Sequence, residues 1–337
     1  MGCASVRPVP TAFVTGGSGF VGAALIRRLV ADGWAVRALA RSAAAEAKVR
    51  AAGAEPASGD LDDGPAMAAA ARGAEVAFHS AAKLGDWARP PWDDFRRVNV
   101  RGTRNVIAAC RAAGVRRLVH VGTEAALLRG QALVAADERA PLAFDSPAPY
   151  AATKAHAEAA VIEANGDGLE TVVVRPRFVW GAGDTTLLPA LSAMVRAGRF
   201  RWIGGGRQLT STTHVANTVE GLVLAAERGR PGHAYFVTDG SPVVFREFVT
   251  ALLGTQGLQA PEAELPLRAA RALAAAGEAA WRVLPLQGAP PLARFALWVS
   301  ALECTIDDTK ARDQLGYQPV VSRDHGLTEL QASAAQP

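Results

Sequence analysis

Residues 11–22 read TAFVTGGSGFVG, a short apolar run followed by closely spaced glycines and then by a helix-like stretch. A dinucleotide pyrophosphate needs free backbone N–H groups, the positive end of a helix and a turn without side chains. Gly16, Gly19 and Gly22 supply that space, and Gly22 also lets the helix pack closely on the strand. Placed between a strand and a helix, the glycines predict a dinucleotide-binding turn, against the alternative of a turn without ligand.

Apolar runs alternate with Ala-rich stretches over the rest of the first 180 residues. Runs that are apolar throughout indicate a parallel sheet covered on both faces, so we expect a doubly wound α/β fold. The predicted strands are 11–15, 34–40, 75–79, 117–122 and 171–175, and the predicted helices are 22–31, 43–52, 93–113 and 150–164. We expect a dinucleotide-binding domain over 1–180, with 211–240 as a candidate return to the sheet. A smaller, mainly helical substrate lobe over 181–330 is expected to interleave with it.

The composition is that of a globular chain, because half of the 337 residues are hydrophobic and a fifth are charged. The net charge of +4 supports an anionic ligand such as a dinucleotide but predicts no nucleic-acid partner. Cys3, Cys110 and Cys304 are too scattered for a disulfide framework or a metal site, and they fit a cytoplasmic setting. No apolar run is long enough to span a bilayer.

The residues after the second predicted strand bear on the choice between NAD and NADP. An acidic residue there would hold a free ribose 2′-hydroxyl. The sequence instead has Ala-Leu-Ala-Arg41-Ser, and Arg41 would attract a 2′-phosphate through a charge-assisted contact. We therefore favour NADP, while NAD with a solvated Arg41 stays open.

Tyr150-Ala-Ala-Thr-Lys154 places a phenol and an ammonium on one face of a predicted helix. A nearby cation favours a phenolate, so we expect Lys154 to lower the pKa of Tyr150 and to hold ribose hydroxyls as well. Thr123 follows the strand 117–122 at the edge where parallel sheets bind ligands, and its hydroxyl could bond a substrate oxygen. A Tyr and a Lys at this spacing occur by chance in many proteins. Here the pair follows a predicted dinucleotide-binding turn in the same chain, and this context favours a catalytic role.

With these motifs in place, the sequence resembles the extended short-chain dehydrogenase/reductase family, also called the NAD-dependent epimerase/dehydratase superfamily. The resemblance implies a Rossmann-type domain and a C-terminal substrate domain. The matching pieces are TGGSGFVG (15–22), GDLDD (59–63), HSAAKLGDW (79–87), VNVRGTRNVIAAC (98–110), HVGTEA (120–125), YAATK (150–154) and RPRFVWGAGD (175–184).

The resemblance also implies roles for single residues. Tyr150 would be the general acid/base, Lys154 its activator and Thr123 the donor to the substrate oxygen. Asn99 matches a recurrent position that we interpret as structural. The implied cofactor-binding residues are Gly16, Gly19, Phe20, Val21, Gly22, Arg41, Asp60, Leu61, Ala81, Ala82, Tyr150, Lys154 and Pro176.

The branch of the family is indicated by the run Gly204-Gly-Gly-Arg-Gln-Leu-Thr210. Nucleotide-sugar enzymes of the family usually carry an Arg where Thr210 stands, and a hydroxyl cannot replace a guanidinium as an anion clamp, although Arg207 or Arg201 could substitute. The sequence as a whole resembles the 3β-hydroxysteroid dehydrogenase-like branch of the family. The predicted C-terminal lobe is also rich in aromatic residues. These aromatic residues line a substrate site or form an ordinary core; they are Trp180, Phe200, Trp202, Trp281, Phe295 and Trp298.

We therefore expect an NAD(P)-dependent ketoreductase or dehydrogenase that interconverts a secondary alcohol and a ketone on a bulky, steroid-like apolar substrate. The alternatives are a nucleotide-sugar epimerase or dehydratase and a non-catalytic dinucleotide-binding regulator. Family analogy suggests a homodimer. The Arg-containing segment 266–299 could lie on a membrane surface, although packing on the substrate lobe is the simpler interpretation. Further polar candidates are His79, His120, His156, His214 and Glu124, and for His79 we favour a structural role.

Overall fold

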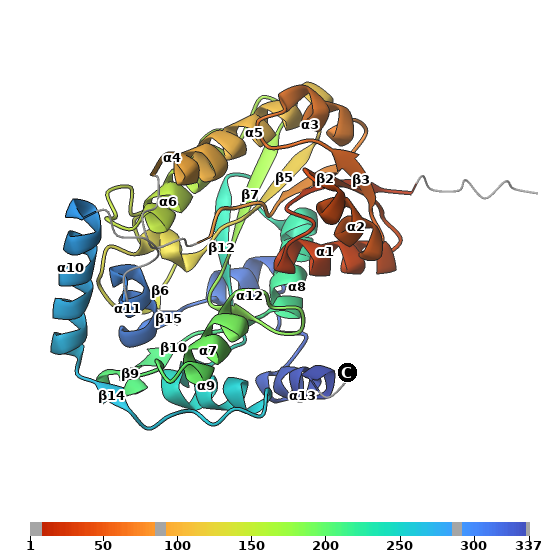
Figure 1. Cartoon of the computed structure of the whole chain (residues 1–337). Coiled ribbons are helices and arrows are strands. Elements are labelled where there is room, and N and C mark those ends of the chain that lie inside the picture. The colour runs from red at the N-terminus through yellow and green to blue at the C-terminus, as the bar shows by residue number, and fades with distance from the viewer. Residues whose placement is uncertain (1–8, 85–91, 285–291, 335–337) are drawn as a thin grey trace, which may run out of the picture.

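A computed structural model describes residues 9–84, 92–284 and 292–334. Its centre is a seven-stranded sheet in the order β3-β2-β1-β4-β5-β7-β12, and all neighbouring strands are parallel (Figure 1). This confirms the predicted doubly wound α/β fold. The strands are β1 (Thr11–Thr15), β2 (Ala35–Ala40), β3 (Glu55–Ser58), β4 (Val76–His79), β5 (Arg117–Val121), β7 (Glu170–Pro176) and β12 (His233–Val237).

Helices cover both faces of this sheet, because successive strand residues point to opposite sides. In β1, Ala12 and Val14 belong to one hydrophobic core and Phe13 belongs to the other. The first core is completed by α1 (Phe20–Ala31), α2 (Ala43–Ala51), α8 (Val215–Arg228) and α12 (Thr309–Leu315). The second core is completed by α3 (Gly64–Ala71), α5 (Gly102–Ala113) and α6 (Pro149–Glu163).

The prediction of one continuous α-helix over 93–113 is wrong, because a π-helical segment interrupts it. The chain forms α4 (Trp92–Phe95), a wider π-helical segment (Arg96–Arg101) and then α5. The wide segment carries Asn99, whose buried amide donates to the Thr153 hydroxyl on α6 at 3.1 Å. The Asn99 side chain also accepts the backbone N–H of Lys83 at 2.7 Å. The irregular turn thus ties α6 to the segment after β4.

The C-terminal part combines helices with short strands that the sequence did not predict. Its helices are α7 (Leu187–Arg196), α9 (Phe245–Gly254), α10 (Leu267–Val283), α11 (Arg294–Ala301) and α13 (Arg323–Ala334). A four-stranded sheet contains β13 (Val243–Val244), β10 (Leu209–Thr210), β15 (Cys304–Ile306) and β6 (Leu133–Ala136). Two further pairs join β8 (Val179–Trp180) to β11 (Thr213–His214) and β9 (Trp202–Ile203) to β14 (Glu264–Leu265).

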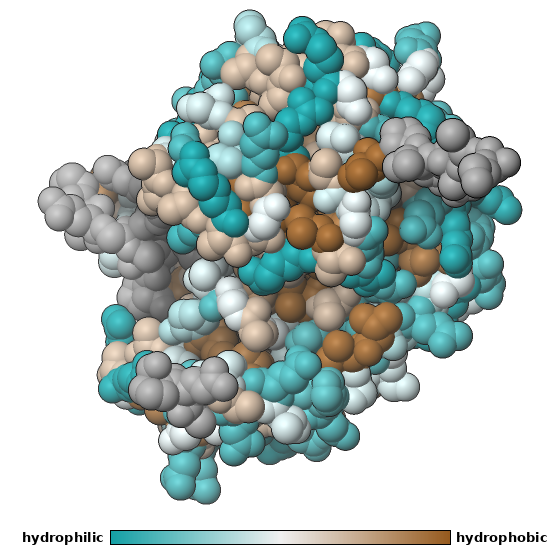
Figure 2. Space-filling model, turned by 90° about the vertical axis from the view of Figure 1, so that its right-hand side faces the viewer, coloured by the Kyte–Doolittle hydropathy of each residue, from teal (hydrophilic) through white to brown (hydrophobic). Residues whose placement is uncertain are grey.

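The predicted segment 266–299 forms α10 and the start of α11, with 285–291 outside the described residues. These two helices pack on one another at one side of the molecule (Figure 1). On the face shown in Figure 2, hydrophobic residues are most frequent across the middle, between more hydrophilic ends. Within 9–84, 92–284 and 292–334, no helix has the length and apolar character needed to cross a membrane.

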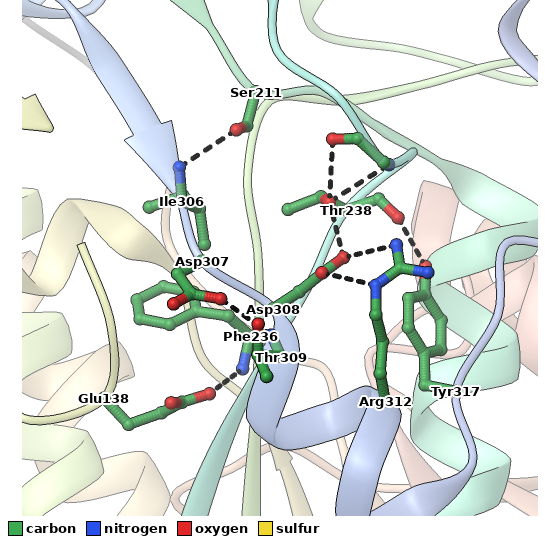
Figure 3. Close-up of polar contacts among 11 residues, drawn as sticks. Glu138, Ser211, Phe236, Thr238, Ile306, Asp307, Asp308, Thr309, Arg312 and Tyr317 are labelled. Atoms are coloured by element: carbon green, nitrogen blue, oxygen red, sulfur yellow. Dashed lines mark hydrogen bonds and ion pairs between the residues drawn. The ribbon is translucent and has the colours of Figure 1, made fainter. Parts of the chain in front are cut away.

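The edge strand β12 has its outward backbone groups bonded by side chains. The Glu138 carboxylate accepts the Phe236 N–H at 2.7 Å (Figure 3), and the Lys310 ammonium donates to the Ala234 carbonyl at 2.8 Å. Burial raises the pKa of Glu138, and the same cause lowers the pKa of Lys310. The outer edge of the sheet is therefore covered by two charged side chains instead of a further strand.

The end of β12 is also fastened to the C-terminal segment, as Figure 3 shows. The Thr238 hydroxyl donates to Asp308 at 2.7 Å, and Arg312 bonds both oxygens of the same carboxylate. The Tyr317 hydroxyl donates to the Thr238 carbonyl at 2.8 Å. The last strand of the large sheet is thus held in place by α12 and the turn after it.

His79 ends β4 and is fully buried. Its Nδ1 lies 2.7 Å from the Thr15 hydroxyl, and its Nε2 lies 2.9 Å from the Thr103 hydroxyl. Thr103 donates its own proton to the Asn99 carbonyl, so the His79 Nε2 donates and Nδ1 accepts. Both nitrogens of the neutral ring have partners, which confirms the structural role.

This histidine predicts a loss of stability in acid. Burial lowers the pKa of His79 from 6.5 to about 3, so below pH 6.5 the unfolded chain takes up a proton that the folded chain does not. The stabilisation is present above pH 6.5 and is lost as the pH falls toward about 3. In urea unfolding between about pH 5.5 and 4.5, His79→Phe should remove about 1.4 kcal/mol per pH unit from the slope of the unfolding free energy. Equal slopes for wild type and His79→Phe would contradict the assignment.

Candidate active site

The carboxyl ends of parallel strands share one edge of the sheet, and the predicted site residues follow those ends. Arg41 comes after β2, Thr123 comes two residues after β5, and Pro176 ends β7. The remaining predicted cofactor residues reach the same edge: Phe20 and Val21 open α1, Asp60 and Leu61 follow β3, and Ala81 and Ala82 follow β4. The fold thus brings together at one edge residues that are distant in the sequence.

The glycine turn after β1 leaves no space for side chains. Gly16 has φ of +75°, and a Cβ there would lie 2.6 Å from the Ala81 nitrogen. A Cβ on Gly22 would lie 2.2 Å from the Gly16 carbonyl oxygen. Gly19 is the N-cap of α1 and provides no side-chain bond to the first-turn amides. A bare helix N-terminus of this kind fits a dinucleotide pyrophosphate.

The predicted adenine-side residues differ in exposure. Arg41 is exposed at the turn into α2. Asp60 is partly buried, and its carboxylate accepts the Asp62 N–H at 3.3 Å. The Leu61 carbonyl accepts from the Asn105 amide at 2.8 Å, so the loop after β3 is tied to α5.

Tyr150 and Lys154 lie on the first turns of α6. Lys154 is 3% exposed, and its Nζ donates to the Val121 carbonyl at 2.7 Å. The same Nζ lies 3.0 Å from the His120 Nε2, which must accept because an ammonium only donates. His120 therefore anchors Lys154 from β5, a contact that the sequence analysis did not predict.

The pKa values in the site follow from burial. Burial lowers the pKa of Lys154 to about 8, although the nearby charge of Glu158 opposes the shift. For Tyr150, burial and then the negative charge of Glu124 raise the pKa, while a hydrogen bond with Thr123 opposes them. The expectation that Lys154 lowers the pKa of Tyr150 is therefore wrong for this structure. Its ammonium is committed to Val121 and His120, and the carboxylate of Glu124 acts on the phenol instead.

Thr123 and Glu124 form a polar chain with Arg177. The Thr123 hydroxyl donates to the Glu124 Oε2 at 2.8 Å, and the Glu124 Oε1 lies 2.5 Å from the Arg177 Nη1. Arg177 also donates to the Thr210 hydroxyl at 3.2 Å. Sequence reasoning did not single out Arg177, because an Arg after a strand has no distinctive spacing. Thr210 is 1% exposed, so its side chain is surrounded by other residues of the protein.

A second buried ion pair joins α6 to β7. Arg175 donates from Nε to both Glu158 oxygens, at 2.9 and 3.1 Å, and both side chains are almost fully buried. The Arg175 guanidinium also lies over the Phe236 ring. No motif in the sequence signalled this pair, which fixes the helix that carries Tyr150 and Lys154.

The aromatic residues of the C-terminal part divide into two groups. Trp180, Phe200 and Trp202 are buried in one hydrophobic core with α7 and α9. These three residues therefore match the expectation of an ordinary core. Phe295 on α11 instead makes an edge-to-face contact with Tyr150, with ring centroids 5.9 Å apart. Trp298 lies next to Phe295 on the same helix. The catalytic candidate thus has an apolar aromatic neighbour.

The chain is similar to known proteins over most of its length. The 3-beta hydroxysteroid dehydrogenase/isomerase family matches residues 13–267. The chain is 50% identical to the 4-hydroxy-2-methyl-3-oxo-4-farnesyl-3,4-dihydroquinoline-1-oxide ketoreductase of Stigmatella aurantiaca, over 94% of this chain and 95% of the relative. It is 41% identical to the 2-alkyl-3-oxoalkanoate reductase of Stenotrophomonas maltophilia, over 96% and 98%. The crystal structure of gox2253 superposes with a TM-score of 0.77 at 27% identity, over 96% and 97%.

The family match covers more than half of the chain, and the two relatives cover nearly all of it. The chain is therefore an NAD(P)-dependent oxidoreductase of the 3-beta hydroxysteroid dehydrogenase/isomerase family, within the extended short-chain dehydrogenases/reductases.

Proposed function

We propose that the chain is an NADPH-dependent ketoreductase that reduces a ketone on a bulky apolar substrate to a secondary alcohol. The observation that carries this proposal is the placement of Tyr150 and Lys154 at the sheet edge that also holds the glycine turn. A pure dinucleotide binder does not need a buried phenol and ammonium on one helix face. The non-catalytic alternative therefore leaves these groups without a purpose.

The residues of the site support separate roles in this reaction. The bound nicotinamide cofactor would supply the hydride that reduces the carbonyl carbon. Tyr150 gives its phenol proton to the carbonyl oxygen as charge develops there. Lys154, anchored by Val121 and His120, is placed to bond the ribose hydroxyls. Thr123 lies beside Tyr150 and orients the phenol.

The apolar class of the substrate is inferred from the names of two relatives and from an aromatic contact in the C-terminal part of the chain. The two relatives are named as a ketoreductase of a farnesylated quinoline oxide and as a reductase of a 2-alkyl-3-oxoalkanoate. Both names describe ketones with large apolar groups. The aromatic contact between Phe295 and Tyr150 supports an apolar substrate in this chain too.

The nucleotide-sugar alternative lacks its anion clamp. Thr210 is buried and accepts a hydrogen bond from Arg177, so this position presents no cation to a diphosphate. Arg177 itself is 1% exposed and is paired with Glu124. An epimerase or dehydratase acting on such a sugar would need another cation to bind the diphosphate.

We also infer a homodimer from family analogy. The outward side of α5 carries Arg104, Ala108 and Arg111, which are exposed in one copy of the chain. A second copy would meet the protein along this helix and α6.

The first prediction concerns Tyr150→Phe. The variant should lose about 10²- to 10⁴-fold in turnover of a bulky ketone, because the phenol proton is no longer available. NADPH affinity should stay within a few-fold of wild type, since only the hydroxyl is removed. NADPH absorbance with the ketone measures turnover, and NADPH fluorescence measures binding. Wild-type turnover by Tyr150→Phe would exclude its role as the acid.

The second prediction concerns the cofactor. Arg41→Ala should weaken NADPH binding by about 1.5–3 kcal/mol, the range of a hydrogen bond to a charged group, while NADH binding stays unchanged. Fluorescence titration with both cofactors measures this. Arg50→Ala, another exposed arginine on the neighbouring α2, is the control and should change neither affinity. Equal losses for NADPH and NADH would contradict a 2′-phosphate contact.

A further inference from the structure

His120 is a buried histidine that contacts the lysine of the candidate active site. It lies on β5, is 1% exposed, and precedes Thr123 by three residues. Its Nε2 lies 3.0 Å from the Lys154 Nζ. The proposed reaction gives Lys154 a role, but it leaves the purpose of this histidine open.

The three protons of the Lys154 ammonium show what the contact does. An ammonium has three donors and no acceptor. One proton goes to the Val121 carbonyl at 2.7 Å, and a second goes to the His120 Nε2. Because both acceptors belong to consecutive residues of β5, they hold the ammonium against the end of that strand. One proton is left for a further acceptor.

The tautomer of His120 indicates that the ring serves Lys154. Since Nε2 accepts, the neutral ring carries its own proton on Nδ1. Among residues 9–84, 92–284 and 292–334, no protein group bonds that Nδ1. A buried donor without a partner is unfavourable. In the neighbouring His79 both ring nitrogens are bonded, so burial at this edge does not by itself leave a nitrogen unpaired.

Two other titratable groups interact electrostatically with Lys154, from β4 and from α6 itself. His79 on β4 is bonded by two threonine hydroxyls, and burial lowers its pKa so that the ring stays neutral. Glu158 on α6 favours the ammonium through its charge, but its carboxylate is paired with Arg175. His120 is therefore the side chain of this set that accepts a proton from Lys154.

We propose that His120 is a positioning residue that accepts one proton of Lys154 and fixes the ammonium against β5, so that a single proton is left for a ribose hydroxyl of the cofactor. The inference rests on the proposed reductase function for the identity of that last acceptor. In this arrangement Lys154 bonds one ribose hydroxyl at a time, whereas an ammonium without His120 has a proton for each of two.

The experiment observes Lys154 itself. The chain has four lysines, so labelling with lysine that carries ¹³C at Cε gives four signals. Lys→Arg variants at Lys48, Lys83 and Lys310 assign three signals and leave that of Lys154. Wild type, His120→Phe and His120→Gln are then titrated without cofactor or substrate.

Phenylalanine keeps a buried ring but has no acceptor, whereas the amide oxygen of glutamine can accept. A hydrogen bond to the charged form of an amine raises its pKa. In wild type, burial lowers the pKa of Lys154 to about 8. We expect the Lys154 midpoint to fall by about one further pH unit in His120→Phe, a tenfold rise in the acid dissociation constant. His120→Gln should restore a midpoint close to that of wild type.

His79→Phe is the matched control, because it removes an equally buried histidine near Lys154 whose nitrogens bond threonines instead. Its Lys154 midpoint should equal that of wild type. A wild-type midpoint in His120→Phe overturns the proposal, as does an equal fall in His79→Phe or in His120→Gln. If His120→Phe does not fold, His120→Leu removes the acceptor with a smaller apolar side chain and must show the same fall.

Cofactor binding gives a separate readout. NADPH and NADH carry the same ribose hydroxyls beside the nicotinamide, so His120→Phe should weaken the binding of both about tenfold, as for the loss of about one hydrogen bond. His120→Gln should bind both cofactors nearly as tightly as wild type does. Fluorescence titration measures the two Kd values, and unchanged values in His120→Phe overturn the ribose contact.

Failure of the proposed function is distinguishable from failure of this inference. The titration of Lys154 needs neither cofactor nor turnover. The expected midpoints and cofactor losses in a protein that reduces no ketone would contradict the reductase function and support the role of His120. Tyr150-dependent reduction combined with a wild-type midpoint in His120→Phe would overturn the role of His120 alone.

Discussion

The contact on which the rest of the site depends is the close approach of backbone to backbone in the turn after β1. The Gly16 carbonyl lies where a Cβ of Gly22 would be, and Gly16 packs on the backbone of Ala81 from the turn after β4. Two strand ends and the first turn of α1 therefore meet without intervening side chains. Any larger residue would push the helix away from the strand and remove the bare N-terminus that suits an anion. The sheet order and the position of α6 then bring the phenol and the ammonium to the same edge.

Around this edge, the protein buries more charge than a core usually tolerates. Two Glu–Arg pairs and one lysine lie almost out of contact with solvent. Each charge is stable there because hydrogen bonds and an opposite charge compensate for lost hydration. Burial also controls protonation. It lowers the pKa of Lys154 to about 8, and it lowers the pKa of His79 and His120 so that both rings stay neutral beside the lysine. The same low-dielectric surroundings hold Tyr150 as a phenol, which suits an acid.

The sequence alone predicted the parallel sheet and the residues at its edge, because glycine spacing and apolar runs are local signals. It did not predict β3, whose four residues include a proline and a serine, or the wide turn that carries Asn99. The two-residue strands of the C-terminal part are too short for any periodic pattern to show. The partners of Lys154, Glu124 and Arg177 also escaped, since such contacts join segments that only the fold brings together. For that reason the direction of the Tyr150 pKa shift was wrong.

The bonded edge of β12 has a consequence for how copies of this chain can meet. Free N–H and C=O groups on an outer strand are a template for β-augmentation, by which another chain extends a sheet. At Ala234 and Phe236 those groups are already bonded by Lys310 and Glu138. A second chain would have to displace two partly buried charged side chains before it could hydrogen-bond there. Growth of a continuous intermolecular sheet, the first step toward a fibril, is therefore disfavoured at this end of the molecule.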